Sequence, residues 1–369
     1  MVTSSFLPGR GGIESYLSEL CTLIAPRVAV LAPPERDGLA LPSDLPYPTV
    51  AGPSSMLWPG RTVADAVVRE ARRLGTDRVL FGTPWPLVLV GPRLRAAGLR
   101  YSVIVHGAEL IVPGAVPGLR RRLARAIGGA ELLLPVSDYT ARATENLLRR
   151  FGVPVPPIER LHARVDTDRF RPGLDATRVR SDLGIGPDQK VVLCFGRLVP
   201  RKGVDRLIAA MVDVARAVPG TVLVVGGTGP EEKKLKRLAA KLSAPVVFAG
   251  RVPDADAPAL YSTADVFGLA VANAWFGLEI EGLGVVLLEA SACETPCVTG
   301  RSGGTPEAVV DGTTGRVVDA RDKRQLTDAL IGLLRDEQQR ATMGAAARRH
   351  VEENFSASTP PGPLLRWLD

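Results

Sequence analysis

The chain alternates short apolar runs with segments of helical period, and this alternation constrains the fold more than any other feature. Most runs are continuous stretches of Val, Leu, Ile and Ala, which is typical of strands buried on both faces of a parallel sheet. Between them lie segments such as 204–218, whose apolar residues recur at the spacing of an α-helix. The pattern predicts an α/β protein with two doubly wound, Rossmann-like domains. The expected strands are 27–32, 78–82, 101–107, 131–137, 190–196, 221–227, 245–250, 265–270 and 295–300.

The length of 369 residues exceeds what one compact core of ordinary size holds. The joint between the domains is expected in 167–190, where proline, glycine and charge replace strand signals. We expect an N-terminal Rossmann-like domain over 1–172 and a C-terminal one over 173–350. A tail over 351–369 is expected to pack back toward the N-terminal domain. The ligand is expected at the carboxyl ends of both sheets, in a deep cleft between the domains.

Several features predict a protein of the reducing cytoplasm. The chain has no run of about 18 uncharged apolar residues, and its start lacks the charged and apolar stretches of a secretory signal. Its four cysteines show no metal-ligand spacing, and Cys194 and Cys293 lie in apolar runs typical of small core residues. Val2–Ser4 is short for a first strand, so we expect that residues preceding Met1 are missing.

The net charge of +7 is concentrated in one half of the chain. Residues 1–175 contain 22 Arg, no Lys and 16 acidic residues, which gives +6, and all seven lysines lie in the remainder. A basic half favours an anionic partner: lipid headgroups, phosphorylated acceptors or nucleic acid. Nucleic acid is the least favoured of the three, because aromatic residues make up only 5% and no nucleic-acid module is present.

The strongest constellation is EGLGVVLLEA at 281–290. Gly282 and Gly284 break the chain before a buried helix, whose free N–H groups and positive dipole end hold phosphate oxygens. Glu289 falls about one and a half turns into that helix, where a carboxylate is able to grip two ribose hydroxyls. Glu281 precedes the helix, placed to meet the other end of the ligand. The alternative is a solvated pair of carboxylates, but Glu289 is embedded in an apolar run and therefore needs partners.

The second constellation is FGRLVPRKGVDRLI at 195–208. A strand ends at Gly196, a loop carries Arg197, Arg201 and Lys202, and a helix follows Gly203. Two cations on such a loop are able to clamp both phosphates of a diphosphate and to stabilise its charge as it leaves. A basic loop by itself is usually solvated surface. The glycine-opened helix in the same domain favours the clamp.

These motifs resemble the family 4 glycosyltransferases in order and spacing, over nearly the whole chain. Among them the chain is most similar to the actinobacterial GDP-mannose-dependent phosphatidylinositol mannoside mannosyltransferases. The Glu-x7-Glu pattern together with GR…KG is specific to the family. The matching segments are GRGGIESYL (9–17), SVIVHGAE (102–109), VSDYT (136–140), RVDTDRF (164–170), GRLVPRKG (196–203), VGGTGPE (225–231), EGLGVVLLEA (281–290) and SGGTPEAVVDGTTG (302–315).

The resemblance implies the GT-B fold, with acceptor binding by 1–172 and nucleotide-sugar binding by 173–350, and a set of donor-binding residues. In that family Arg197 and Lys202 would bind the donor diphosphate, Glu289 the ribose and Glu281 the transferred sugar. His106, at the end of an expected strand, would contact the donor sugar near the reacting carbon. A lone histidine in such a place is often only a hydrogen-bonded packing residue. The remaining donor contacts would come from Gly11, Gly12, Val252, Gly282, Leu283 and Gly284.

The resemblance also implies retaining transfer, in which the acceptor hydroxyl attacks from the face that the diphosphate leaves. The leaving phosphate would be the base, which suits a sequence without a carboxylate pair spaced for double displacement. The reaction would require no metal and no cofactor besides the nucleotide-sugar. The Asp-x-Asp at Asp254–Asp256 resembles a Mn²⁺ motif of the other glycosyltransferase fold. We interpret it as a carboxylate pair at a helix start.

Three places depart from the family pattern. Ala163–Arg164 replaces Asn-Gly or Ser-Gly, HGAE at 106–109 replaces HGHE, and the tail is broken by proline where relatives carry a helix. These departures would alter the choice of acceptor or weaken the contact between the domains.

The stretch 115–129 carries Arg120, Arg121, Arg122 and Arg125 among Leu, Ala and Ile at helical spacing. In lipid-modifying relatives such a basic amphipathic helix rests on anionic membrane, here the inner face of the plasma membrane. The alternative is an ordinary surface helix.

The sequence therefore predicts a retaining hexosyltransferase that moves mannose from GDP-mannose to a phosphatidylinositol mannoside or similar glycolipid. One alternative keeps the fold with a UDP- or ADP-hexose and a soluble acceptor. Another is a catalytically silent nucleotide-binding protein, against which the intact Arg197, Lys202, Glu281 and Glu289 argue. A dehydrogenase is the third, but the first strand lacks a GxGxxG.

Overall fold

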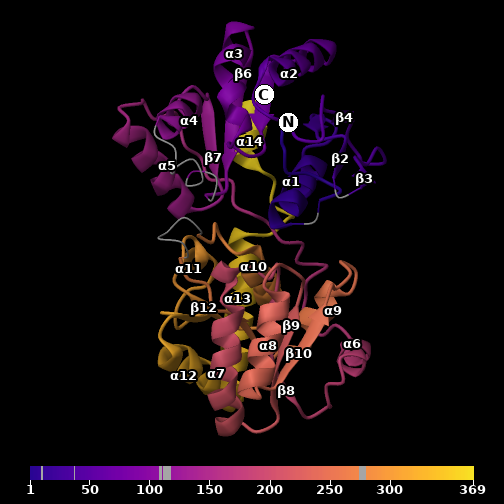
Figure 1. The fold of residues 1–369 in the computed structure, drawn as a ribbon, viewed down its shortest axis with the longest axis vertical. Helices are drawn as coiled ribbons and strands as arrows, with labels where there is room; N and C mark the ends of the chain where they lie inside the picture. The colour runs from indigo at the N-terminus through magenta and orange to yellow at the C-terminus, as the bar shows by residue number, and fades with distance from the viewer. Residues whose placement is uncertain (10, 37, 108–109, 111–117, 274–279) are drawn as a thin grey trace. The chain divides into compact units, whose positions relative to one another are not determined.

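The computed structural model describes residues 1–9, 11–36, 38–107, 110, 118–273 and 280–369. The chain forms two compact units, Met1–Ala163 with Pro360–Asp369, and Arg164–Thr359 (Figure 1). The division after Ala163 comes earlier than the expected boundary at 172. The expected tail is divided as well, because 351–359 belong to the second unit and only 360–369 to the first.

The second unit contains one six-stranded parallel sheet in the order β10-β9-β8-β11-β12-β13. Five of its strands confirm the runs expected from the sequence, whereas the edge strand β13 was not anticipated. Its alternating buried and half-buried residues produce no continuous apolar run. The strands are β8 (Lys190–Phe195), β9 (Thr221–Gly226), β10 (Val246–Gly250), β11 (Val266–Leu269), β12 (Cys297–Gly300) and β13 (Gly315–Val318).

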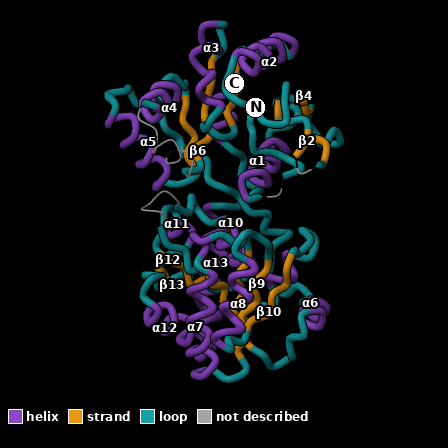
Figure 2. Tube along the Cα trace, in the orientation of Figure 1, coloured by secondary structure: helices purple, strands orange, loops and turns teal. Residues whose placement is uncertain are grey.

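Helices flank this sheet (Figure 2). The apolar side of α7, which includes Leu207, Ile208 and Met211, is buried, and the helix packs beside α8, α12 and β9. The short helix α10 packs against α13. The helices of this unit are α6 (Thr177–Asp182), η4 (Pro200–Lys202), α7 (Val204–Ala217), α8 (Glu232–Leu242), α9 (Ala257–Tyr261), α10 (Val285–Ala292), α11 (Thr305–Ala308), α12 (Lys323–Arg335) and α13 (Glu337–Asn354).

The first unit is built on parallel strands that Val2 joins together. Val2 bridges Leu31 of β1 and Phe81 of β5. The short N-terminal segment therefore lies between the two-stranded group β1-β4 and the three-stranded group β5-β6-β7. The strands are β1 (Val30–Ala32), β4 (Thr49–Ala51), β5 (Arg78–Phe81), β6 (Arg100–Val105) and β7 (Leu132–Pro135), with a hairpin of β2 (Glu35–Arg36) and β3 (Leu39–Ala40). The helices are α1 (Gly12–Leu23), α2 (Arg61–Arg73), η1 (Leu87–Val90), α3 (Gly91–Ala96), α4 (Leu119–Ile127), α5 (Asp138–Arg150) and α14 (Gly362–Leu368).

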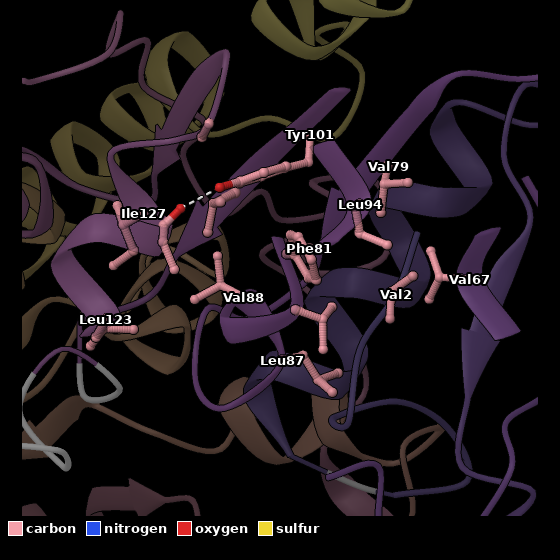
Figure 3. Packing of buried hydrophobic residues seen from close by; sticks show 14 of the residues in the cluster. Val2, Val67, Val79, Phe81, Leu87, Val88, Leu94, Tyr101, Leu123 and Ile127 are labelled. Carbon is pink, nitrogen blue, oxygen red and sulfur yellow. Dashed lines mark hydrogen bonds between the residues drawn. The ribbon is translucent and has the colours of Figure 1, made fainter. Parts of the chain in front are cut away.

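A continuous apolar core fixes the helices of this unit to the sheet (Figure 3). Tyr101 lies fully inside it and packs edge-to-face on Phe81, with ring centroids 5.4 Å apart. Its hydroxyl donates a hydrogen bond of 2.5 Å to the carbonyl oxygen of Ala126 in α4. Because a buried hydroxyl needs a partner, this bond ties α4 to β6.

The C-terminal residues form a helix after the proline pair, so the sequence-based expectation that the tail lacks one was wrong. Pro361 caps α14, whose Leu364 is fully buried in the first unit beside β7 (Figure 1). The indole N–H of Trp367 donates to Glu131 at 3.1 Å, and its carbonyl accepts from Arg78 at 2.5 Å. None of the described helices is long and apolar enough to cross a bilayer.

Candidate active site

The loop between β8 and α7 positions the basic residues that the sequence singled out. Its last turn, η4, ends at Gly203, which has a φ of 67° and starts α7. A Cβ at this position would collide with the carbonyl oxygen of Ala270, just beyond β11. Only glycine allows this approach, and the approach fixes Lys202 against the end of the neighbouring strand.

Lys202 and Glu281 form a buried ion pair. Their side-chain atoms Nζ and Oε2 are 2.9 Å apart, and the two residues are only 8% exposed each. Arg201 adds its Nε at 3.5 Å from the same oxygen. The structure thus brings together one of the two expected diphosphate ligands and the expected sugar ligand.

The segment 302–304 holds the backbone of Glu281 in place. The backbone N–H of Glu281 donates to Ser302 Oγ at 3.4 Å, and the backbone carbonyl of Glu281 accepts from the N–H of Gly304 at 3.1 Å. Gly303 has a φ of 56°, and a Cβ there would collide with that carbonyl. The SGGTPE motif therefore supports the carboxylate of Glu281, a role that the sequence did not reveal.

The ion pair determines the charge of Glu281. Burial alone raises the pKa of this carboxyl, but the charges of Lys202 and Arg201 overcome it and hold the pKa below its ordinary value. Glu281 is therefore ionised at neutral pH. It serves as a hydrogen-bond acceptor and not as an acid.

The glycine-opened helix expected after Glu281 is α10. Gly284, with a φ of 90°, is its N-cap, and no side chain caps its first turn. Leu283 is buried, while Gly282 is half-buried. Uncapped N–H groups at a helix start attract anions, so this end of α10 has the chemistry expected for phosphate oxygens.

Glu289, in the second turn of α10, accepts a hydrogen bond of 2.5 Å from the hydroxyl of Tyr261. Burial raises the pKa of Glu289, and the bond from Tyr261 and the charge of Arg169 reduce that effect without cancelling it. Burial also raises the pKa of Tyr261 well above its ordinary value, so its hydroxyl stays protonated and donates.

Tyr261 is fully buried and held by three aromatic rings. Phe170, Phe195 and Phe267 lie 5.6–5.7 Å from it between ring centroids. The sequence did not reveal this residue, because nothing in its segment PALYSTAD (258–265) separates a ring that supports a carboxylate from one that only fills the core.

The remaining donor residues of the second unit lie at loop positions. Arg197 follows β8 and is exposed, and it makes no ion pair within the described part of the chain. Val252 follows β10 and is half-buried. In the described residues, the Lys202–Glu281 ion pair does not include Arg197, which the sequence paired with Lys202 as a diphosphate ligand.

In the first unit, Gly11 and Gly12 open α1. Gly11 is the N-cap, and the Glu14 carboxylate folds back beside it. That carboxylate pairs with Arg36 at 3.2 Å.

His106 directly follows β6 and is buried. Its Nε2 lies 2.9 Å from the carbonyl oxygen of Gly82, and its ring packs edge-to-face on Tyr16 at 5.6 Å. Because a carbonyl only accepts, Nε2 carries the proton. His106 therefore makes the contacts of a hydrogen-bonded packing residue, which was the alternative interpretation. It also lies at a strand end, where ligands bind in such sheets.

The four arginines of the expected basic helix differ from one another. In α4, Leu123, Ala124 and Ile127 are buried, whereas Arg121, Arg122 and Arg125 are exposed. Arg120 is half-buried, and its Nε is enclosed. Residues 115–117 of this stretch, and Ala108 and Glu109 of HGAE, lie outside the described residues.

Asp254 and Asp256 lie at the start of α9, as the sequence predicted. Asp256 stands at the N-cap of α9 but makes no capping bond there, and pairs instead with Arg178 at 2.8 Å. In the described ranges no three His, Cys, Asp or Glu side chains cluster as metal ligands. All four cysteines are free and buried.

Comparison with known proteins identifies the family. The model of the glycosyl transferases group 1 matches residues 175–350. A GDP-mannose-dependent alpha-(1-6)-phosphatidylinositol monomannoside mannosyltransferase of Mycolicibacterium smegmatis is 40% identical, over 100% of this chain and 97% of that protein. A GDP-mannose-dependent monoacylated alpha-(1-6)-phosphatidylinositol monomannoside mannosyltransferase of Corynebacterium glutamicum is 37% identical, over 96% and 93%.

The fold has close counterparts among solved structures. Anabaena HepE in complex with UDP superposes with a TM-score of 0.82 at 20% identity, over 100% of this chain and 99% of that one. The parallel sheets of both units and this likeness confirm the expected fold. The chain belongs to the group 1 glycosyltransferases and is a hexosyltransferase with the GT-B fold of two Rossmann-like domains.

Proposed function

We propose that this enzyme transfers mannose from GDP-mannose to a glycolipid acceptor of the phosphatidylinositol mannoside class. The relatives from Mycolicibacterium and Corynebacterium, which match nearly the full length of the chain, carry this donor and this acceptor in their names. The observation that carries the proposal is the buried Lys202–Glu281 pair beside the uncapped start of α10. It provides a cation for a phosphate and an ionised acceptor for sugar hydroxyls in one place.

When the donor binds, Lys202 and Glu281 separate, and each side chain takes a part of the donor as its new partner. The ammonium of Lys202, joined by Arg197, neutralises the diphosphate, whose oxygens also meet the N–H groups at Gly282–Gly284. Glu281, released from Lys202, accepts hydrogen bonds from the hydroxyls of the mannose. Such an exchange costs little, because each buried charge keeps a partner throughout.

Transfer proceeds with retention in this proposal. The bond between the anomeric carbon and the diphosphate oxygen breaks, and the acceptor oxygen bonds to the same face of that carbon. The acceptor proton goes to a leaving phosphate oxygen. Lys202 and Arg197 stabilise the charge that develops, which needs neither a metal nor a second carboxylate.

Contacts at the other end of the nucleotide complete the donor site. Glu289 accepts from two ribose hydroxyls while Tyr261 fixes its carboxylate, and Val252 lies against the base. From the first unit, Gly11 and Gly12 contact the diphosphate and His106 the transferred sugar. In this proposal the unit Met1–Ala163 with Pro360–Asp369 binds the acceptor, and the unit Arg164–Thr359 binds the nucleotide-sugar. These units replace the ranges 1–172, 173–350 and 351–369 that the sequence suggested.

The acceptor places the enzyme at a membrane surface, on the inner face of the plasma membrane. Arg121, Arg122 and Arg125 form an exposed basic row on α4, which suits anionic headgroups. Flotation with vesicles that contain anionic lipid, in low and high salt, tests this part of the proposal. An enzyme that stays off such vesicles at low salt contradicts it.

Donor and acceptor are tested together by radiolabelled transfer. The full-length protein is incubated with phosphatidylinositol monomannoside in mixed vesicles and with GDP-mannose, UDP-glucose or ADP-glucose, with and without EDTA. The proposal expects mannolipid from GDP-mannose only, in both conditions. Glycolipid made from UDP- or ADP-glucose in its place overturns the donor, and inhibition by EDTA overturns metal independence.

A further inference from the structure

Arg201 lies beside the Lys202–Glu281 pair, and the proposed function gives it no role. It is the second residue of the turn η4. The end of β11 holds this turn at two points. The carbonyl oxygen of Arg201 accepts from the backbone N–H of Ala272 at 3.3 Å, and Gly203 lies against the carbonyl oxygen of Ala270. The backbone that carries both cations is therefore fixed.

Arg201 and Lys202 contact the same oxygen atom of Glu281. Nζ of Lys202 lies 2.9 Å from Oε2, and Nε of Arg201 lies 3.5 Å from it. The side chains of Lys202 and Glu281 are 10% and 11% exposed, whereas that of Arg201 is 32% exposed. The nearer cation is therefore enclosed with the carboxylate, and the other reaches the same oxygen from a more exposed position.

The two contacts have different fates in the proposed reaction. Lys202 leaves Glu281 for the diphosphate, and the diphosphate brings further negative charge close to the carboxylate. Burial without a counter-charge and a nearby anion both disfavour the ionised form of a carboxyl group. Glu281 has to stay ionised if both of its oxygens are to accept hydrogen bonds. A second cation is therefore needed beside Glu281 while the donor is bound.

Arg201 is the charge that remains for this purpose. Burial raises the pKa of Glu281, and the charges of Lys202 and then of Arg201 lower it below the ordinary value. From the segment 302–304, which packs on its backbone, Glu281 meets a hydroxyl and an N–H group, neither of them charged. Among the described residues, Arg201 is therefore the cation left at Glu281 once Lys202 has turned to the phosphates.

We propose that Arg201 is a positioning residue that holds the carboxylate of Glu281 while Lys202 is bound to the diphosphate. The inference rests on the proposed function for this exchange of partners. It gives the two neighbouring cations separate roles: Lys202 acts on the leaving group, and Arg201 acts on the residue that binds the sugar.

A double-mutant cycle on donor binding tests this role without turnover. GDP-mannose is titrated by calorimetry, in the absence of acceptor, into the native chain, Arg201→Gln, Glu281→Gln and the double variant. We expect Arg201→Gln to weaken binding about tenfold in the native chain, because a charged contact is lost. In the Glu281→Gln background it should weaken binding less than about twofold, because no carboxylate remains to be held.

Arg237→Gln is the matched control for the loss of charge. It removes an exposed guanidinium of the same unit, on α8, where Arg237 donates to the carbonyl of Lys233 in its own helix at 3.3 Å. This variant should bind GDP-mannose like the native chain. Arg201→Lys keeps the charge and should retain most of the native affinity. Melting temperatures of all variants verify the fold.

The pH profile of transfer gives a second readout, which a purely structural role does not change. The acid limb of kcat reports the donor complex, and that of kcat/KM for the donor reports the free enzyme. Arg201→Gln should move the acid limb of kcat upward by about one pH unit, because loss of this cation raises the pKa of Glu281. The acid limb of kcat/KM should move less, since Lys202 still holds the carboxylate in the free enzyme.

Three results overturn the role of Arg201. Equal losses of affinity with and without Glu281→Gln would show that Arg201 contacts the donor directly. Native affinity in Arg201→Gln, or equal shifts of the two acid limbs, would show that Glu281 does not need it. The same titrations with UDP-glucose separate this proposal from the proposed function. Coupling between Arg201 and Glu281 that appears with UDP-glucose, in a protein that does not bind GDP-mannose, overturns the choice of donor and leaves the role of Arg201 in place.

Discussion

Lys202 and Glu281 depend on each other, since each is the buried counter-charge of the other. Lys202→Ala removes the cation that faces the leaving diphosphate in the proposed mechanism. We expect kcat to fall about 10²-fold or more. Lys241→Ala, an exposed lysine on α8, serves as the control and should retain wild-type turnover.

The measurement is steady-state transfer at saturating donor, with circular dichroism to verify folding. Part of any stability loss in Lys202→Ala reflects the carboxylate of Glu281 that remains, which Arg201 still partly compensates. A folded Lys202→Ala enzyme with wild-type kcat removes this residue from the mechanism.

In the proposed function Glu289 binds the ribose and Tyr261 holds the carboxylate of Glu289, which would make Tyr261 a positioning residue. Tyr261→Phe keeps the ring among its aromatic neighbours and deletes only the hydroxyl that donates to the carboxylate. One lost hydrogen bond of about 1 kcal/mol predicts roughly fivefold weaker GDP binding with little change in kcat. Titration with GDP and with its 2′,3′-dideoxy analogue checks this: the variant should lose affinity for GDP and not for the analogue. Equal losses for both ligands contradict the positioning role.

The two acidic residues of the site predict opposite effects of pH on stability. The folded pKa of Glu281 is lowered, so its contribution is present above the ordinary carboxyl value of 4.5 and is lost as the pH falls through the folded pKa. The folded pKa of Glu289 is raised, so its contribution is present below 4.5 and is lost as the pH rises through the folded pKa.

Chemical denaturation from pH 3 to 7 measures both effects. Glu281→Gln should flatten the loss of stability on the acid side of 4.5, while Glu289→Gln should gain stability relative to the native chain as the pH rises above 4.5. Identical pH profiles for the two variants would show that the ion pair does not distinguish these carboxyls.

At the scale of elements, the sequence predicted the strands well where both of their faces are buried. The runs at 190–196 and 221–227 became adjacent central strands, because continuous Val and Leu leave little choice but burial. The edge strands β4 and β13 were missed, since Thr49 in β4 and Gly315 and Arg316 in β13 leave no continuous apolar run. The burial pattern of a strand, more than its length, determined whether the sequence predicted it.

In the site, the sequence predicted the local features and missed the contacts between segments that are distant in the chain. The glycine-opened helix α10 and the turn before α7 are local features, and the sequence placed both. The pairing of Glu289 with Tyr261 joins distant segments through the sheet. No spacing rule predicts such a contact, because the order of the strands determines it. The same holds for the different environments of Arg120 and Arg121.

The turn into α7 provides a test of how an element positions a side chain. Gly203→Ala places a Cβ against the carbonyl of Ala270, so the turn must shift and move Lys202 with it. Gly220→Ala is the control, because Gly220 has a similar φ of 79° with no atom within 4 Å of the added Cβ. Both variants should lose about 1–2 kcal/mol of unfolding free energy to backbone strain. Only Gly203→Ala should also lose turnover, and equal turnover in the two variants contradicts a positioning role for the turn.

At the scale of the whole molecule, the last ten residues complete the first unit, although the chain reaches them only after building the second. Leu364 is fully buried there, and Arg366 pairs with Glu159 while Trp367 bonds to Glu131. The stability of the first unit therefore depends on the C-terminus, whereas Lys202, Glu281 and Glu289 lie in the other unit.

Leu364→Ala separates the two units experimentally. The cavity left by the side chain should cost the first unit about 2–4 kcal/mol, and Leu365→Ala, at a half-buried neighbour, should cost less. Calorimetry with and without GDP measures the outcome. The transition of the first unit should move down, while GDP should still raise the transition of the second unit, because Lys202 and Glu289, the proposed GDP ligands of that unit, are retained. If Leu364→Ala abolished the GDP shift, donor binding by the second unit would require an intact first unit, which contradicts the expected separation.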